Sequence, residues 1–192
     1  MSMKTLKELQ KLGGFQGLRK ISHSSNQITI VHNLESEFIS NKYAHEWDFD
    51  IFLPKYGMNL QRPYVWTLLQ QQELIWSMIL GRSIPPIVVI YNEHKRYEVI
   101  DGKQRIITIK RFLNNEFPII IDGEEVYYKD LDADTHYQIS YRNSLDGEIY
   151  YSYDDAKITD DQKIALFNFY NFAGTPQEAE HRDRLIKIQN SL

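Results

Sequence analysis

The clearest pattern along the chain is a helical spacing of apolar residues over 68–80, where leucine, isoleucine and tryptophan recur three and four positions apart. Thr67 and Gln70 have the identities and spacing of a capping box at the start of this helix. Gly81 is suited to the C-terminal cap, and the prolines at 85–86 prevent the helix from continuing. The pattern therefore predicts an amphipathic helix between Thr67 and Gly81.

The apolar spacing then changes to that of strands. The run at 87–91 is apolar throughout and predicts a buried strand, and 96–100 predicts a second strand that pairs with it as a hairpin. Ile106 and Ile109 then mark one face of a helix predicted over 103–113. This hairpin and helix form the centre of the predicted fold.

Weaker patterns predict further elements on both sides of this centre. These are an amphipathic helix at 6–12, strands at 28–31, 49–53 and 148–153, a hairpin of 117–121 with 126–128 around Asp122-Gly123, a helix at 159–170 and a last helix from Pro176. Together they predict an α/β (α+β) protein with helices around a compact mixed sheet. The 192 residues are expected to form one domain, with a core over about 28–128 and a helical C-terminal part over about 129–192.

Candidate chemistry gathers at the start of the predicted helix 103–113. Asp101 can act as its N-cap, with Gln104 completing a capping box, and Gly102 allows a ligand to approach the backbone. The unpaired N–H groups and positive dipole end of a helix start bind anions, and Lys103 and Arg105 add two cations. Two interpretations follow from these residues alone: a phosphate or nucleotide site, or a capped helix whose charges are solvated.

Three blocks of the sequence carry a resemblance to a known family. They are Asp101-Gly102-Lys103-Gln104-Arg105, then Gln61-Arg62-Pro63-Tyr64-Val65-Trp66 with Ile84-Pro85-Pro86-Ile87, and finally Asn171-Phe172-Ala173-Gly174-Thr175-Pro176. In order and spacing they resemble the N-terminal domain family of GmrSD-type restriction endonucleases, with Lys103 in place of the first glutamine of that family's DGQQR box. The family belongs to the ParB/sulfiredoxin superfold, so the resemblance implies a single ParB-like domain.

The resemblance also implies a nucleotide pocket and its function. The implied nucleotide- and phosphate-binding residues are Gln61, Arg62, Gly102, Lys103, Gln104 and Arg105. Asp101 and Arg105 are implied as catalytic residues in the hydrolysis of a nucleoside triphosphate, with a divalent ion such as Mg²⁺. In the resembled systems hydrolysis is coupled to recognition of modified or foreign DNA. DNA and a separate nuclease subunit are therefore implied partners, since this sequence shows no nuclease signature of its own.

Composition limits the remaining alternatives. The chain has no cysteine, which excludes disulfides, thiolate catalysis and cysteine-based zinc sites, and its six histidines show no metal-binding spacing. Asp130, Asp132 and Asp134 imitate a calcium loop that lacks its glycine and its last glutamate, so no metal site is predicted. No apolar run has the length of a membrane span and the N-terminus lacks a signal-peptide core, so a cytoplasmic protein is expected.

The net charge of −4 bears on the kind of partner. Non-specific DNA-binding proteins are usually basic, because neutralisation of phosphates supplies much of their affinity. An acidic chain is expected to bind DNA only through a local patch. The alternative to a nucleotide hydrolase is therefore a non-enzymatic module of phage or mobile-element origin that binds a DNA phosphate or a partner protein.

Overall fold

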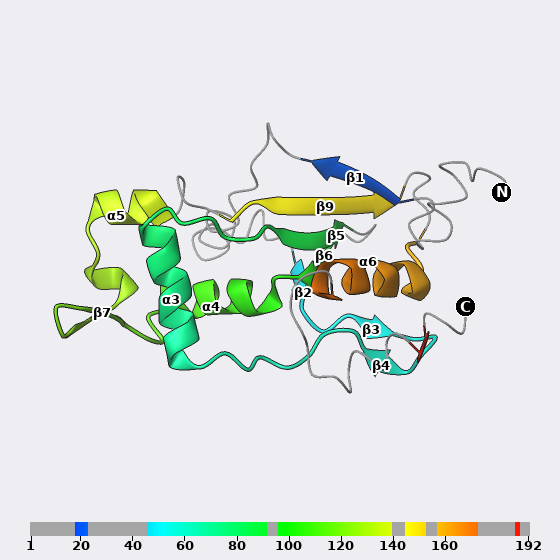
Figure 1. Ribbon diagram of the computed structural model, residues 1–192, viewed down its shortest axis with the longest axis horizontal. Helices are drawn as coiled ribbons and strands as arrows, with labels where there is room; N and C mark the ends of the chain where they lie inside the picture. The colour runs from blue at the N-terminus through cyan, green and yellow to red at the C-terminus, as the bar shows by residue number, and fades with distance from the viewer. Residues whose placement is uncertain are drawn as a thin grey trace, which may run out of the picture.

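The largest element is a five-stranded mixed sheet with the strand order β1-β9-β5-β6-β2 (Figure 1). The computed structural model describes residues 18–22, 46–91, 96–139, 145–152, 157–172 and 187–188. The strands of the sheet are β1 (Leu18–Ser22), β2 (Glu46–Asp48), β5 (Ile87–Tyr91), β6 (Arg96–Asp101) and β9 (Gly147–Ser152). The pairs β1–β9 and β5–β6 are antiparallel, whereas β5–β9 and β2–β6 are parallel, so the prediction of a mixed sheet is confirmed.

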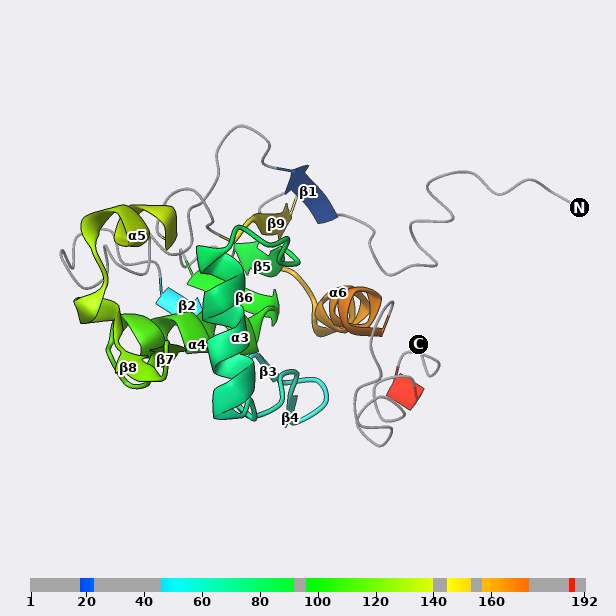
Figure 2. The ribbon, with the colours of Figure 1, turned by 60° about the vertical axis from the view of Figure 1, so that its left-hand side comes forward.

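Helices and two small hairpins surround this sheet. The helices are α3 (Leu68–Ile79), α4 (Lys103–Leu113), α5 (Ala133–Tyr137) and α6 (Asp160–Phe172), with a 3-10 turn η1 (Tyr128–Asp130). The hairpins are β3 (Phe52–Leu53) with β4 (Met58–Asn59), and β7 (Ile119–Ile121) with β8 (Glu124–Val126). Figure 2 shows α4 and α6 on opposite sides of β6.

The two faces of the sheet bury separate apolar cores. Ile87 and Val89 of β5 belong to the core that contains the buried faces of α3 and α4. Val88 and Ile90 of the same strand belong to the core beneath α6 and the β3–β4 hairpin. Side chains alternate between the faces of a strand, so a continuous apolar run indicates a strand covered on both sides. This explains why residues 87–91 are apolar throughout.

The strongest local patterns correspond to observed elements. Thr67 and Gln70 form the predicted capping box of α3, and the hairpin of β5 with β6 leads directly into α4. The hairpin around Asp122-Gly123 and the elements β9 and α6 are also confirmed.

Other predictions were wrong. Of the strand expected at 49–53, only Phe52–Leu53 forms a strand, β3, because the Asp50 N–H donates a hydrogen bond to Asp48 Oδ1 at 3.0 Å and bends the chain. Residues 55–59, for which no element was predicted, contain β4, and β1, β2, η1 and α5 were not predicted either. The expected helix at 6–12 and the strand at 28–31 lie outside the described residues, as does the last helix from Pro176 except for residues 187–188, which are helical.

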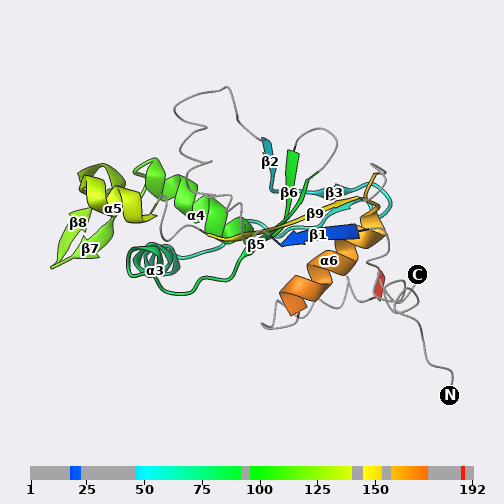
Figure 3. The ribbon, with the colours of Figure 1, turned by 90° about the horizontal axis from the view of Figure 1, so that it is seen from above.

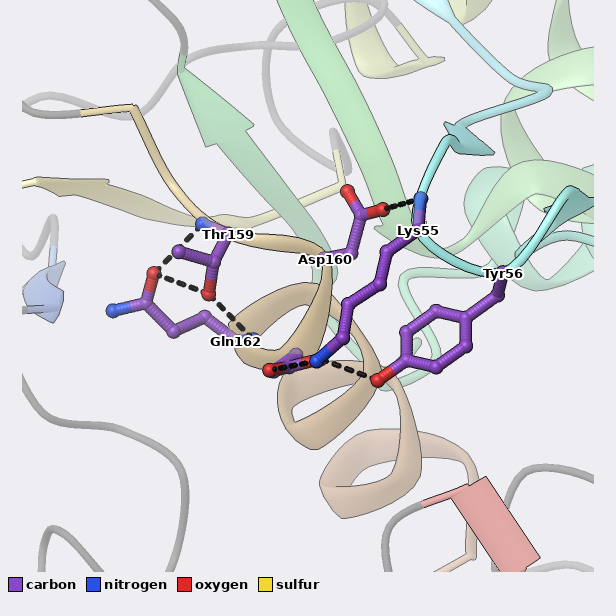
Figure 4. Close-up of polar contacts among 6 residues, drawn as sticks. Lys55, Tyr56, Thr159, Asp160 and Gln162 are labelled. Atoms are coloured by element: carbon purple, nitrogen blue, oxygen red, sulfur yellow. Dashed lines mark hydrogen bonds and ion pairs between the residues drawn. The ribbon is translucent and has the colours of Figure 1, made fainter. Parts of the chain in front are cut away.

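The β3–β4 hairpin is attached to the start of α6 (Figure 4). Lys55 Nζ lies 2.7 Å from Asp161 Oδ2, and the Tyr56 hydroxyl donates to Asp161 Oδ1 at 2.5 Å. The Lys55 N–H donates to Asp160 Oδ2 at 2.8 Å. Thr159 caps the same helix, since its Oγ1 accepts the N–H of Gln162 at 3.3 Å. This helix start therefore serves as a point of tertiary attachment.

Candidate functional site

The candidate site lies where β6 passes into α4. β6 ends at Asp101, Gly102 has a φ of 102°, and α4 begins at Lys103. A Cβ atom on Gly102 would lie 2.5 Å from Ile87 Cγ2 and 2.9 Å from Ile87 Cβ. Only glycine combines this left-handed conformation with so close an approach to β5. The missing side chain therefore makes room for Ile87 and lets the strand turn directly into the helix.

The N-cap of α4 differs from the prediction. Gly102, rather than Asp101, is the N-cap, and it makes no side-chain hydrogen bond. The helix thus starts one residue later than a capping box of Asp101 and Gln104 requires, so that prediction was wrong. The Asp101 carboxylate pairs instead with Arg105, with 2.7 Å between Oδ2 and Nη2.

The two candidate glutamines hold the polypeptide chain around the site. Gln61 Nε2 donates to the carbonyl oxygens of Val99 and Ile100 at 2.6 and 2.7 Å. Gln104 Nε2 donates to Pro63 O at 3.0 Å, and Gln104 Oε1 accepts the Val65 N–H at 2.9 Å. These bonds attach the segment before α3 to the end of β6 and the start of α4. The sequence resemblance brought these blocks together, and the structure places them side by side.

Lys103 is the most buried cation of the site. Its side chain is 7% exposed, and its Nζ lies 2.6 Å from Oδ1 of Asp50, whose own side chain is 72% exposed. The pair therefore lies at the protein surface on the Asp50 side and in the interior on the Lys103 side. If a second anion approached Lys103, the exposed Asp50 carboxylate could rotate into solvent and leave Lys103 Nζ to pair with that anion.

Arg105 and Arg62 differ in how many hydrogen bonds they make with the rest of the protein. Arg105 Nη2 donates to Pro86 O at 3.1 Å as well as to Asp101, while its buried Nε has no hydrogen-bond partner among the described residues. Arg62 is half-buried and makes no hydrogen bond or ion pair with any residue that the structure describes. Within the described part of the chain, Arg62 is thus the candidate cation whose guanidinium group is unpaired.

The electrostatics of this helix start favour an anion. The first turn of α4 contains no acidic residue, whereas α6 has Asp160 and Asp161 there and α3 has a complete capping box. The N–H groups of a first helical turn have no partner within the helix, and the dipole places positive charge beside them. Cations at this end add to that charge, so a phosphate is the group that best complements it.

A groove of about 470 Å³ opens beside Arg105, which is one of its lining residues. One wall is a single face of α3, formed by Leu69, Gln70, Glu73, Leu74 and Ser77, together with Trp66 just before the helix. The segment Ser83–Pro85 forms the other wall, and Figure 3 shows this segment running from α3 back to β5. This groove was not predicted from the sequence, although the polar positions 70, 73 and 77 on one helical face were a signal for it.

The remaining candidates contribute little to this site. Asn171 Nδ2 donates to Phe167 O at 3.0 Å within α6, and the rest of the third sequence block lies outside the described residues. Asp132 accepts the Thr135 N–H at 2.7 Å, and this backbone hydrogen bond lowers the pKa of Asp132.

Across the described ranges, no group of three histidine, aspartate or glutamate side chains is arranged to hold a metal ion. None of the described helices has the length and apolar character needed to cross a membrane.

Comparison with known proteins gives one family match. The model of the family described as "GmrSD restriction endonuclease, N-terminal domain" matches residues 36–191, well over half of the chain. No curated protein and no solved structure matches the chain. The matched range includes the segment before α3, the β5–β6 hairpin and the start of α4, which together form the candidate site. This chain therefore belongs to the family of N-terminal domains of GmrSD restriction endonucleases.

Proposed function

We propose that this chain binds a nucleoside triphosphate with its phosphates at the start of α4 and hydrolyses it as part of a restriction system. The observation that carries the proposal is the basic start of α4, where a glycine cap and no acidic residue accompany Lys103 and Arg105. Such a helix start favours phosphate groups. Membership of a restriction endonuclease family supports a role in defence against foreign DNA.

The three cations would bind the phosphates in different ways. Lys103 would exchange the exposed carboxylate of Asp50 for a phosphate oxygen, since charge-assisted hydrogen bonds to either group are similar in kind. Arg62 would bind phosphate directly with its free planar guanidinium group. Arg105, already oriented by Pro86 and Asp101, would stabilise the charge that develops on the transferred phosphate.

The other candidate residues would support this binding. Gln61 and Gln104 would fix the backbone around the phosphates through the hydrogen bonds that they already make. Gly102 would allow the helix start to lie close to β5. Asp101 would hold the Mg²⁺ ion that accompanies the nucleotide, because Mg²⁺ is commonly bound by one or two carboxylates together with substrate phosphates. DNA cleavage would then belong to a nuclease subunit, the proposed partner.

A module that binds without hydrolysis is the second candidate, and the pairing of Asp101 favours it. Asp101 Oδ2 already accepts a hydrogen bond from Arg105 at 2.7 Å, so this oxygen is engaged in an ion pair rather than open to a water molecule. Release of inorganic phosphate from bound nucleotide separates the two candidates. Binding of DNA phosphates in place of nucleotide would instead appear as strongly salt-dependent DNA binding in the absence of nucleotide.

Thermal unfolding with ATP, GTP, CTP or UTP, each with and without Mg²⁺, tests the binding site. A ligand at a hundred times its Kd adds about 2.7 kcal/mol to the stability of the native state, which corresponds to an increase in Tm of roughly 5–10 °C for a chain of this size. We expect such an increase for the wild type and a much smaller one for Arg62→Gln. Arg62 makes no hydrogen bond or ion pair with the described residues, so this change should leave the fold intact.

Lys129→Gln is the control for the loss of one positive charge. Lys129 is exposed in η1, and its N–H donates to Asn115 Oδ1, beyond the C-terminal end of α4. Lys129 therefore lies at the opposite end of α4 from the candidate site. This variant should retain the full ligand-dependent increase in Tm. No increase with any of the four nucleotides in the well-folded wild type would overturn the proposed function.

A further inference from the structure

The groove beside Arg105 has the size and lining of a site for a small organic molecule. Its volume of about 470 Å³ falls within the range of ligand pockets, roughly 300–1,000 Å³. Apolar side chains such as Trp66 and Leu69 form much of its wall, with a small number of polar groups among them. This combination is typical of sites that bind a partly apolar ligand and orient it through few hydrogen bonds.

The groove and the start of α4 are continuous. Arg105 belongs to both, because it lies in the first turn of α4 and lines the groove. The preceding residue, Gln104, accepts the Val65 N–H, which places the start of α4 beside the start of α3. A molecule with phosphates at Arg105 would therefore extend along α3 from the level of Trp66.

The length of the groove matches a nucleoside. Leu69 and Ser77 line the groove from the same face of α3, eight residues apart, which corresponds to roughly 12 Å along the helix axis. A phosphate and the far edge of the base on the same nucleotide are separated by a similar length. Trp66 offers an indole surface along this path, and aromatic side chains bind bases of any identity by stacking.

Glu73 adds a means of choosing the base. It is exposed on the groove wall, and its carboxylate has no partner among the residues that the structure describes. An ionised carboxylate only accepts hydrogen bonds, and it accepts two parallel ones most favourably. Guanine presents adjacent N1–H and N2–H donors, whereas adenine, cytosine and uracil each place an acceptor next to their donor.

We infer that this groove binds the nucleoside part of the nucleotide and that Glu73 selects guanine through N1–H and N2–H. The inference rests on the proposed function, because the phosphates must lie at Arg105. It assigns the recognition of the base to Glu73 of α3, which lies between the sequence blocks that carry the family resemblance.

Isothermal titration with GTP, ITP, ATP and inorganic tripolyphosphate, each with Mg²⁺, tests the inference. ITP lacks the N2 amine of guanine, so it retains one of the two donors. We expect GTP to bind about tenfold more tightly than ATP, with ITP between them. Glu73→Gln should remove this preference and leave the affinity for tripolyphosphate unchanged.

Glu124→Gln is the matched control, because Glu124 is an exposed glutamate of β8 and does not line the groove. It should retain the preference for GTP. Equal affinity for GTP and ATP, or a preference that survives Glu73→Gln, would overturn the inference while binding of tripolyphosphate still supports the phosphate site. If neither tripolyphosphate nor any nucleotide binds, the proposed function and the inference both fail.

Discussion

The starts of α4 and α6 satisfy the same electrostatic requirement in opposite ways. Both expose first-turn N–H groups and the positive end of a helix dipole. α6 meets this with its own residues, since Thr159 caps it and two aspartates occupy its first turn. α4 has a glycine cap and places Lys103 and Arg105 in its first turn.

The difference indicates what each helix start is for. At α6 the carboxylate of Asp161 receives Lys55 and Tyr56 from the β3–β4 hairpin, so charges and hydrogen bonds are complete within the protein. At α4 the compensating carboxylates, Asp50 and Asp101, belong to other elements and contact the cations rather than capping the amides. A helix start completed by its own residues attaches one part of the chain to another, whereas one left basic is suited to an anionic ligand.

The largest expected effect comes from Gly102→Ala. The new Cβ would overlap Ile87 at 2.5 Å and would force a non-glycine residue to a φ of 102°. We expect the free energy of unfolding to fall by at least about 3 kcal/mol, because steric overlap in a packed interior adds to backbone strain. Urea-induced unfolding measures this change.

Gly57→Ala is the matched control in the hairpin that contacts α6. Gly57 also has a positive φ, 61°, but a Cβ there would meet nothing within 4 Å. This change should lower the free energy of unfolding by only about 1 kcal/mol, the cost of the left-handed conformation alone. Equal losses for the two variants would show that close packing against Ile87 does not distinguish the start of α4.

Replacing one aspartate at each helix start separates attachment from anion binding. Asp101→Asn removes a negative charge that competes with a phosphate for Arg105, so affinity for tripolyphosphate without Mg²⁺ should rise roughly fivefold. Asp161→Asn should leave that affinity unchanged, because its carboxylate contacts Lys55 and Tyr56. Each variant should lower the free energy of unfolding by about 1 kcal/mol, since both carboxylates are partly exposed.

Isothermal titration and urea-induced unfolding of the same two preparations provide the measurements. A rise in affinity for both variants would indicate a general effect of net charge rather than a site at α4. An unchanged affinity for Asp101→Asn would place the bound anion away from Arg105.

The parts of the fold that the sequence predicted depend on local chemistry. The apolar spacing of α3 and its Thr67–Gln70 box are properties of a short segment, and the structure confirms both. The β5–β6 hairpin and α4 were predicted for the same reason. By contrast, β1 pairs with β9 across most of the chain length, and no local pattern in residues 18–22 specifies that partner.

The structure places the sequence blocks of the candidate site side by side, but the contacts between them were not predicted from the sequence. The N-cap of α4 is Gly102 rather than Asp101, and Gly102 packs against Ile87, a contact between residues far apart in sequence. The hydrogen bonds of Gln61 to the carbonyls of Val99 and Ile100 likewise require the folded chain. The sequence motifs thus indicated which segments lie together, whereas the hydrogen-bond partners of each side chain depend on tertiary packing.

The smallest expected effect is the pH dependence of the attachment at α6. Burial alone would raise the pKa of Asp161, but hydrogen bonds from Lys55 and Tyr56 outweigh it and lower the pKa. A lowered folded-state pKa adds stability above the unfolded pKa, about 3.9, and this stability is lost as the pH falls through the folded value. The loss of unfolding free energy caused by Asp161→Asn should therefore be constant from pH 7 to about pH 5 and shrink below about pH 4.

In a Lys55→Met background the same substitution should show a weaker dependence on pH, because the main favourable partner of the carboxylate is absent. A pH dependence that is unchanged in that background would mean that Lys55 does not stabilise the charged form of Asp161, and the start of α6 would then owe its stability to its cap alone.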